Sequence, residues 1–265
     1  MNNSEIITLI MAAIIAGVLA AGFLAGYSVI FVFNRMPAAW LSDYGEEPDA
    51  SLYGERLSVR PYGMILSVVF VLLFTFLIMQ YDSAAYSVIG MLGLWLLMLI
   101  GIADHKCMII PDQLVIALAA VGAVLAVLEL LVFGSGGMAE IAVRPPYFHP
   151  VWYSPFAGAL IGGGSIWLIG MIGSILTKQE AMGFGDVKLL AAAGFMCGIR
   201  GILVILALTV LLSGVWFMLL ILAKKIRRGD HKPLGPYIAA SCGLYTVFYT
   251  KVNMLVDMYL GLYVI

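Results

Sequence analysis

Long apolar runs dominate the chain and are separated by short polar stretches. Runs of about 20 apolar residues are long enough to cross a bilayer as helices, and the chain divides into about eight of them. The sixth is short for a full crossing, and Lys251, Asn253 and Asp257 interrupt the eighth. The pattern predicts an all-α, polytopic membrane protein with one membrane domain over residues 1–265. The approximate runs are 6–33, 62–81, 85–103, 113–133, 156–176, 187–199, 201–223 and 235–257.

Composition supports this interpretation and excludes other classes. Of the 265 residues, 63% are hydrophobic and 11% are charged, which is typical of an integral membrane protein. The net charge of -1 argues against a nucleic-acid partner, which would call for a clustered basic face. Cys107, Cys197 and Cys242 are widely separated, so neither a disulfide framework nor a metal site is expected. The first run follows no basic segment and is expected to be a retained helix rather than a signal peptide.

Basic residues predict the orientation of the chain. With eight crossings, one set of loops contains eleven of the fourteen Lys and Arg residues, and the positive-inside rule places that set in the cytoplasm, with both termini outside. The other side has Arg144, Arg200 and Lys251. The cytoplasmic set is Arg35, Arg56, Arg60, Lys106, Lys178, Lys188, Lys224, Lys225, Arg227, Arg228 and Lys232.

One acid lies in a glycine-rich turn that opens directly into an apolar run on the predicted cytoplasmic face. The stretch reads Gly183-Phe184-Gly185-Asp186-Val187-Lys188-Leu189. An ionisable group at membrane depth costs roughly 2.5–3.5 kcal/mol on insertion scales, so such groups are usually functional or neutralised by a partner. The position of Asp186 therefore directs the search to a second acid on the same face.

Asp104 is the candidate for that second acid, because it ends the third apolar run on the same face. Pro111 and Asp112 follow it at the start of the fourth run. There the missing N–H of a proline is harmless, and an acid meets the positive end of the helix dipole. Asp112 thus has a sufficient structural explanation as a first-turn acid, whereas Asp104 has none as obvious.

Asp104 and Asp186 could form two carboxyl groups that share a proton, as in aspartic proteases. Two unit charges about 4 Å apart repel by roughly 4 kcal/mol at an effective dielectric of about 20, which favours retention of one proton. The ionised member would activate a water, and the protonated member would polarise the scissile carbonyl. Gly183 and Gly185 would leave room for substrate backbone. In the structural alternative, Asp186 merely caps a helix that starts at Val187, and Asp104 marks a membrane boundary.

The remaining polar residues in these runs have structural interpretations. His105, Lys106 and Lys188 are expected to be solvated boundary charges, although Lys188 could also help to keep Asp186 ionised. Glu129, near the predicted outer end of the fourth run, is expected to be water-exposed or hydrogen-bonded. Glycines at GxxxG spacing permit close helix approach in membranes, and they occur at Gly22 and Gly26 and again at Gly158 and Gly162.

The ordered set of motifs resembles the type IV prepilin peptidase family of GxGD membrane aspartic peptidases. Residues 183–189 are similar to its GxGD signature, and Asp104 with Pro111 is similar to its first catalytic Asp and the turn that follows. GxGD alone also occurs in presenilin-like peptidases, but the ordered set covers nearly the whole chain. Three further stretches are similar in kind, namely Asn34-Arg35-Met36-Pro37, Gly162-Gly163-Gly164 and Pro233-Leu234-Gly235-Pro236-Tyr237.

The resemblance implies an aspartic endopeptidase of the bacterial-type cytoplasmic membrane. Such enzymes remove the short basic leader of type IV prepilins or pseudopilins at the cytoplasmic face, so the processes implied are pilus assembly and protein secretion. Asp104 and Asp186 would be catalytic, Gly183 and Gly185 would contact substrate, and no metal would be required. Membrane lipid would be the other partner.

The loop at residues 34–61 departs from the family pattern. Full-length bifunctional members carry paired CxxC motifs in this cytoplasmic loop and also methylate the new N-terminus with S-adenosylmethionine. Here the loop contains no cysteine, which excludes a zinc-stapled loop. Methyl transfer stays open, because the missing cysteines concern the folding of the loop rather than its chemistry.

Two other functions compete with this interpretation. A presenilin-like intramembrane protease would have a different context around the first Asp and usually a Pro-Ala-Leu turn near its end, and neither is seen. A proton-coupled transporter could use intramembrane acids as a relay, but it would favour inverted repeats and acids near mid-membrane. The sequence has no evident repeat, and its paired acids are predicted at one face.

Overall fold

The computed structural model describes residues 2–42, 57–81, 83–134, 152–178, 183–225, 232–259 and 261. Within these residues the fold is all-α, as predicted, with one short 3-10 turn, η1 (Ala38–Trp40), and no strand. Residues 43–56, half of the predicted loop at 34–61, fall outside the described residues. The helices are α1 (Asn3–Arg35), α3 (Val59–Gln80), α4 (Ala84–Cys107), α5 (Asp112–Gly134), α6 (Ser154–Thr177), α7 (Phe184–Leu222), α8 (Gly235–Val247) and α9 (Tyr249–Tyr259).

Six of these helices, α1 and α3 to α7, are long and apolar enough to cross a membrane. In a bilayer every backbone polar group needs an internal partner, which helices supply. Large apolar side chains such as Leu19, Leu72 and Leu160 face outward, where lipid would cover them. The prediction of a polytopic membrane protein is confirmed.

Helix α7 doubles back on itself at Gly198. That residue has φ 67° and ψ −171°, a conformation that glycine adopts far more readily than other residues. The limbs on either side, residues 184–197 and 199–222, correspond to the predicted sixth and seventh runs, 187–199 and 201–223. As one straight helix these 39 residues would extend for roughly 58 Å, well beyond a bilayer.

The packing of α6 against α7 establishes the reversal. An added Cβ at Gly158 of α6 would lie 2.3 Å from the carbonyl oxygen of Gly194 in the first limb. It would lie 2.6 Å from the backbone of Gly198 at the turn. One helical turn farther along α6, at Gly162, the neighbours are Leu190 of the first limb and Ile202 of the second. From Gly158 to Gly162 along α6, the neighbours are therefore earlier residues of the first limb and later residues of the second limb. The two limbs are antiparallel.

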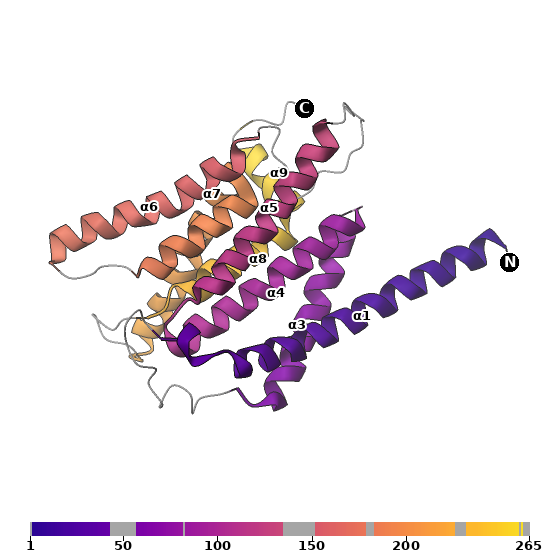
Figure 1. The fold of residues 1–265 in the computed structure, drawn as a ribbon, viewed down its shortest axis with the longest axis horizontal. Helices are drawn as coiled ribbons and strands as arrows, with labels where there is room; N and C mark the ends of the chain where they lie inside the picture. Colours follow the sequence, from indigo (N-terminus) through magenta and orange to yellow (C-terminus); the bar gives the residue numbers. More distant parts are fainter. Residues whose placement is uncertain are drawn as a thin grey trace.

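The GxxxG glycines permit the close helix approach that their spacing predicted. In α1, an added Cβ at Gly22 would lie 2.7 Å from Val71 of α3, and one at Gly26 would lie 2.2 Å from the backbone nitrogen of Ser67. The Ser67 hydroxyl donates a hydrogen bond to the Phe23 carbonyl at 2.9 Å. Figure 1 shows α1 and α3 beside the body of the helix bundle, with the N-terminal half of α1 extending away from it.

The predicted eighth run, 235–257, forms two helices rather than one. Helix α8 ends at Val247, Phe248 departs from helical geometry with φ −109° and ψ 24°, and α9 begins at Tyr249. The polar residues that interrupt the run in sequence therefore lie in a separate helix.

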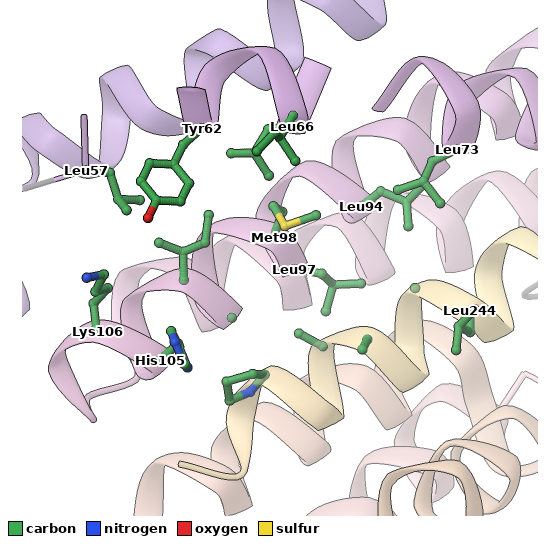
Figure 2. A pocket seen from close by; sticks show the side chains of 17 residues that line it. Leu57, Tyr62, Leu66, Leu73, Leu94, Leu97, Met98, His105, Lys106 and Leu244 are labelled. Carbon is green, nitrogen blue, oxygen red and sulfur yellow. The ribbon is translucent and has the colours of Figure 1, made fainter. Parts of the chain in front are cut away.

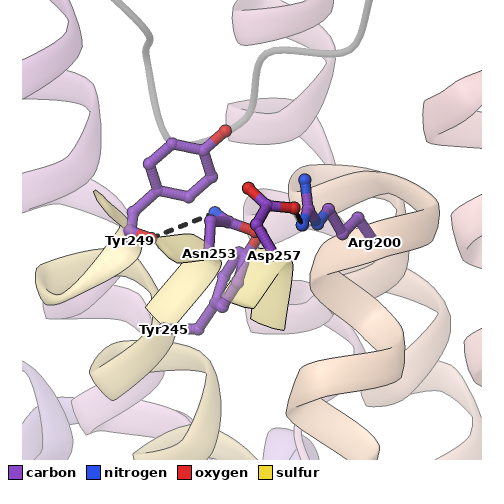
Figure 3. A network of polar contacts seen from close by, with 5 residues as sticks. All are labelled: Arg200, Tyr245, Tyr249, Asn253 and Asp257. Atoms are coloured by element: carbon purple, nitrogen blue, oxygen red, sulfur yellow. Dashed lines mark hydrogen bonds and ion pairs between the residues drawn. The ribbon is translucent and has the colours of Figure 1, made fainter. Parts of the chain in front are cut away.

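A polar network fixes α9 against the turn of α7 (Figure 3). Arg200, two residues after Gly198, forms an ion pair with Asp257 of α9. The Asn253 amide donates hydrogen bonds to the Tyr249 carbonyl at 3.0 Å and to the Tyr245 hydroxyl at 3.4 Å. The break after α8 thus lets charged and amide side chains reach the end of the bundle where α7 reverses.

Candidate active site

The first predicted acid, Asp104, lies in the last turn of α4. Asp104 is 5% exposed and is one of the few buried acids among the described residues. Helix α4 ends at Cys107, and Met108 adopts a left-handed conformation with φ 54° while its N–H bonds to the Asp104 carbonyl at 2.9 Å. The chain therefore turns away directly after Asp104 and leads into α5.

The start of α8 holds the Asp104 carboxyl group. The backbone N–H of Gly235 donates a hydrogen bond of 2.8 Å to Asp104 Oδ2. An added Cβ at Gly235 would lie 2.5 Å from the same oxygen, so any side chain there would push the carboxyl group aside. The N-terminal end of a helix also favours negative charge. Gly235 belongs to the stretch at residues 233–237, where no role was predicted for it, although a glycine before Pro236 at a helix start was the available signal.

The second predicted acid, Asp186, lies in the first turn of α7. The helix begins at Phe184, three residues earlier than the predicted Val187, and its N-cap residue is Gly183. Asp186 is half-buried and is already inside the helix, with its own N–H bonded to the Gly183 carbonyl at 3.2 Å. The structural alternative, in which Asp186 caps this helix, is therefore wrong.

The fold brings Asp104 and Asp186 to the same end of the bundle. Their carboxyl groups are near enough to interact electrostatically, although 82 residues of sequence separate them. One acid comes from the end of α4 and the other from the start of α7, while α8 anchors the first. The two acids thus come from different helices and lie within electrostatic range of each other.

The two glycines of the predicted substrate-binding pair differ in their surroundings. Gly183 is exposed, and an added Cβ would meet only Asp186 Oδ2, at 3.9 Å. Gly185 is half-buried, and an added Cβ would lie 3.2 Å from the Ile110 side chain. Gly185 therefore has a packing reason to be small, whereas Gly183 leaves open space beside the carboxyl group.

Lys188 does not act as the solvated boundary charge that was predicted. Its Nζ donates to both carboxylate oxygens of Asp112 at 2.8 Å, and the same ammonium lies 5.0 Å from the ring centroid of Phe184. Asp112 is a first-turn acid of α5, as expected. The ion pair joins the start of α5 to the helix that carries Asp186.

Glu129 is the other buried acid of the membrane helices. It is 7% exposed, and its Oε1 has no hydrogen-bond partner among the residues that the structure describes. The prediction of water exposure is therefore wrong, and hydrogen bonding of that oxygen is not found. Over the same described ranges, no group of three or more His, Cys, Asp or Glu residues could hold a metal ion.

Comparisons with known proteins locate the same region. Residues 91–219 match the model of the type IV leader peptidase family. A protein of Xanthomonas campestris pv. campestris named prepilin leader peptidase/N-methyltransferase is 34% identical over 157 residues, which cover 59% of this chain and 47% of that protein. A protein of the same name from Aeromonas salmonicida is 30% identical over 149 residues, covering 55% and 44%.

A third relative with that name, from Pseudomonas putida, is 28% identical over 192 residues, which cover 70% of this chain and 57% of the relative. The chain spans about half the length of the curated relatives it matches. No solved structure matches it. The resemblance seen in the sequence is confirmed: residues 91–219, which include both Asp104 and Asp186, match the type IV leader peptidase family.

Proposed function

We propose that this chain is a membrane aspartic endopeptidase that removes the leader of type IV prepilins or pseudopilins, with Asp104 and Asp186 as its catalytic pair. The observation that carries the proposal is the electrostatic interaction of two acids from α4 and α7, one of them buried and anchored by Gly235. The substrate class comes from the relatives, which are named prepilin leader peptidases.

The proposed reaction needs one ionised and one protonated carboxyl group. The ionised group takes a proton from water, whose oxygen attacks the scissile carbonyl carbon, and the protonated group donates a hydrogen bond to the carbonyl oxygen. Collapse of the tetrahedral intermediate breaks the C–N bond, and the amine leaves with a proton from the acid pair. Gly183, exposed beside Asp186, gives an extended substrate backbone access to the carboxyl group.

The proposed location is the bacterial-type cytoplasmic membrane, with the paired acids at the cytoplasmic face. Support comes from the eleven-to-three bias of basic residues, which assigns the loops flanking Asp104 and Asp186 to the cytoplasm. Thiol labelling from outside the cell would test this. Lys178→Cys should be protected from the thiol reagent in intact cells. The double variant Arg200→Cys/Asp257→Asn should be more accessible to the reagent than Lys178→Cys.

Methyl transfer is a separate question that the names of the relatives raise. The cavity between α3, α4 and α8 is lined mostly by apolar side chains, with no acidic side chain among its described lining residues. That cavity does not fit S-adenosylmethionine, which carries a sulfonium cation, an amino acid group and ribose hydroxyls. Mass spectrometry of a mature pilin N-terminus would settle the activity by the presence or absence of one methyl group.

Two substitutions test the peptidase proposal. Asp104→Asn and Asp186→Asn should each abolish leader removal from a co-expressed prepilin while the protein still inserts in the membrane. Asp257→Asn makes the same chemical change at the other end of the bundle and should leave processing intact. Full processing by either of the first two variants would rule out the paired-acid mechanism. A presenilin-like protease would instead cut within the apolar helix of its substrate, which the mass of the product would show.

A further inference from the structure

A large apolar cavity lies between α3, α4 and α8 (Figure 2). Its volume is about 610 Å³, within the usual range for sites that hold small molecules. Apolar side chains form most of the labelled walls, namely Leu66 and Leu73 of α3, Leu94 and Met98 of α4, and Leu244 of α8. Asp104 and Asp186 are not among the lining residues, so the cavity is distinct from the paired acids.

Polar groups are confined to one end of the cavity. His105 and Lys106, which directly follow Asp104, lie there with the hydroxyl of Tyr62 directed toward them (Figure 2). None of the described lining residues is acidic. The cavity is therefore amphipathic, with a basic mouth and an apolar body, and it would favour an anionic head group attached to an apolar tail.

The length of the cavity matches one leaflet of a bilayer. Its walls follow α4 from Leu94 to His105, a rise of roughly 17 Å at 1.5 Å per residue. Half of a hydrocarbon core of about 30 Å is about 15 Å. A lipid whose head group lies at Lys106 would therefore extend its tail along the whole apolar wall.

The volume and lining of the cavity suit extended hydrocarbon chains. About 610 Å³ of space runs beside the apolar wall of α4, and its basic groups lie only at the Lys106 end.

We propose that this cavity is a binding site for an anionic phospholipid of the leaflet at the Asp104 end, with the phosphate at Lys106, His105 and Tyr62 and acyl chain between α3, α4 and α8. The proposal goes beyond the peptidase activity and does not depend on it. Because α4 and α8 both line the cavity and also meet at Asp104, bound lipid would support the helix pair that positions that acid.

Native mass spectrometry of the full chain would test the site. The detergent-solubilised protein is titrated with phosphatidylglycerol and with phosphatidylcholine of the same acyl chains. We expect one phosphatidylglycerol to be retained preferentially, by about fivefold for one lysine near the membrane surface. The double variant His105→Gln/Lys106→Gln should lose the preference and still retain lipid. The matched control Lys178→Gln, at the end of α6, should keep it. Equal retention of the two lipids by the wild type would overturn the head-group assignment.

A filling variant tests the position of the acyl chain. Ala240 lines the cavity and is exposed, so Ala240→Phe should occupy the space and lower lipid retention severalfold without disturbing the core. Ala13→Phe makes the same change on an exposed position of α1, away from the cavity, and should have no effect. Unchanged retention by Ala240→Phe would show that the retained lipid binds elsewhere.

A photo-reactive residue in the cavity distinguishes a bound lipid from a bound protein segment. This test does not require a variant that fills the cavity or removes its charges. Benzoylphenylalanine at Leu66, in membranes that contain a co-expressed prepilin, should cross-link to phospholipid. Cross-links to the apolar segment of the prepilin in place of lipid would overturn the proposal.

Discussion

Gly235 and Asp104 are 131 residues apart in sequence, and the N–H of the first donates a 2.8 Å hydrogen bond to the carboxyl group of the second. The bond makes the start of α8 part of the candidate site, although the matched family region ends at residue 219. Any side chain at Gly235 would displace the carboxyl group, because an added Cβ would lie 2.5 Å from Asp104 Oδ2.

Gly235→Ala should therefore reduce leader removal by about a hundredfold, the loss that a shift of about 1 Å can produce in a catalytic group. The rate is measured on a purified prepilin in detergent, with kcat and KM separated. The fall should be in kcat. Gly243→Ala is the control on the same helix, because its added Cβ would meet Leu94 at an ordinary 3.4 Å. Equal rates for the two variants would contradict the positioning role of Gly235.

The ion pair of Lys188 and Asp112 should contribute modestly to stability. The two side chains are 29% and 27% exposed, and pairs of this kind typically contribute about 0.2–1 kcal/mol. A double-mutant cycle of Asp112→Asn and Lys188→Met, followed by thermal unfolding in detergent, should give a coupling energy in that range. Lys188→Arg should retain most of it. Strictly additive effects would mean that the pair does not hold α5 to α7.

Gly26 should tolerate no side chain, because α1 and α3 are in backbone contact there. An added Cβ would lie 2.2 Å from the Ser67 nitrogen, and overpacking of this kind costs roughly 1–3 kcal/mol. Gly26→Ala should lower the unfolding midpoint. Gly17→Ala on the same helix has nothing within 4 Å and should raise it slightly, because alanine favours helix over glycine. The opposite signs of the two shifts are the decisive result.

Glu129→Met should stabilise the protein. A buried polar atom without a partner costs about 1–3 kcal/mol, and Glu129 Oε1 has no partner among the described residues. Methionine keeps a similar length and removes that cost. Gln113→Met, at an exposed position of the same helix, is the control and should change stability little. Destabilisation by Glu129→Met alone would indicate that this carboxyl group has a partner or a function of its own.

The sequence was sufficient for the parts of the fold that depend on local composition. Apolar length identified the crossings, and the small residues at Gly26 and Gly158 identified two close helix contacts, because both signals lie within single helices. Lys251, Asn253 and Asp257 showed that the last run is interrupted, but the break at Phe248 was not predicted. The ion-pair partner of Asp257 is Arg200 of α7, which the local sequence does not reveal.

The candidate site, too, was predictable from the sequence only in part. Asp104 and Asp186 could be identified because acids are expensive within apolar runs. The partners of Asp104 and Lys188 could not, since Gly235 acts through its backbone N–H and Asp112 already had a local explanation at its helix start. Contacts between residues 76 or 131 positions apart depend on how helices pack, and a single sequence does not encode them in any local pattern.

The reversal at Gly198 also bears on which peptides can reach Asp186. The first limb of α7, residues 184–197, is roughly 21 Å long, shorter than a hydrocarbon core of about 30 Å. Its two ends cannot both reach the head groups. With the ion pair of Arg200 and Asp257 in the polar setting it needs at the Gly198 end, we expect the Asp186 turn to lie just below the opposite surface. A freely diffusing peptide would have to leave water to arrive there, whereas one attached to a membrane helix is delivered at the required depth.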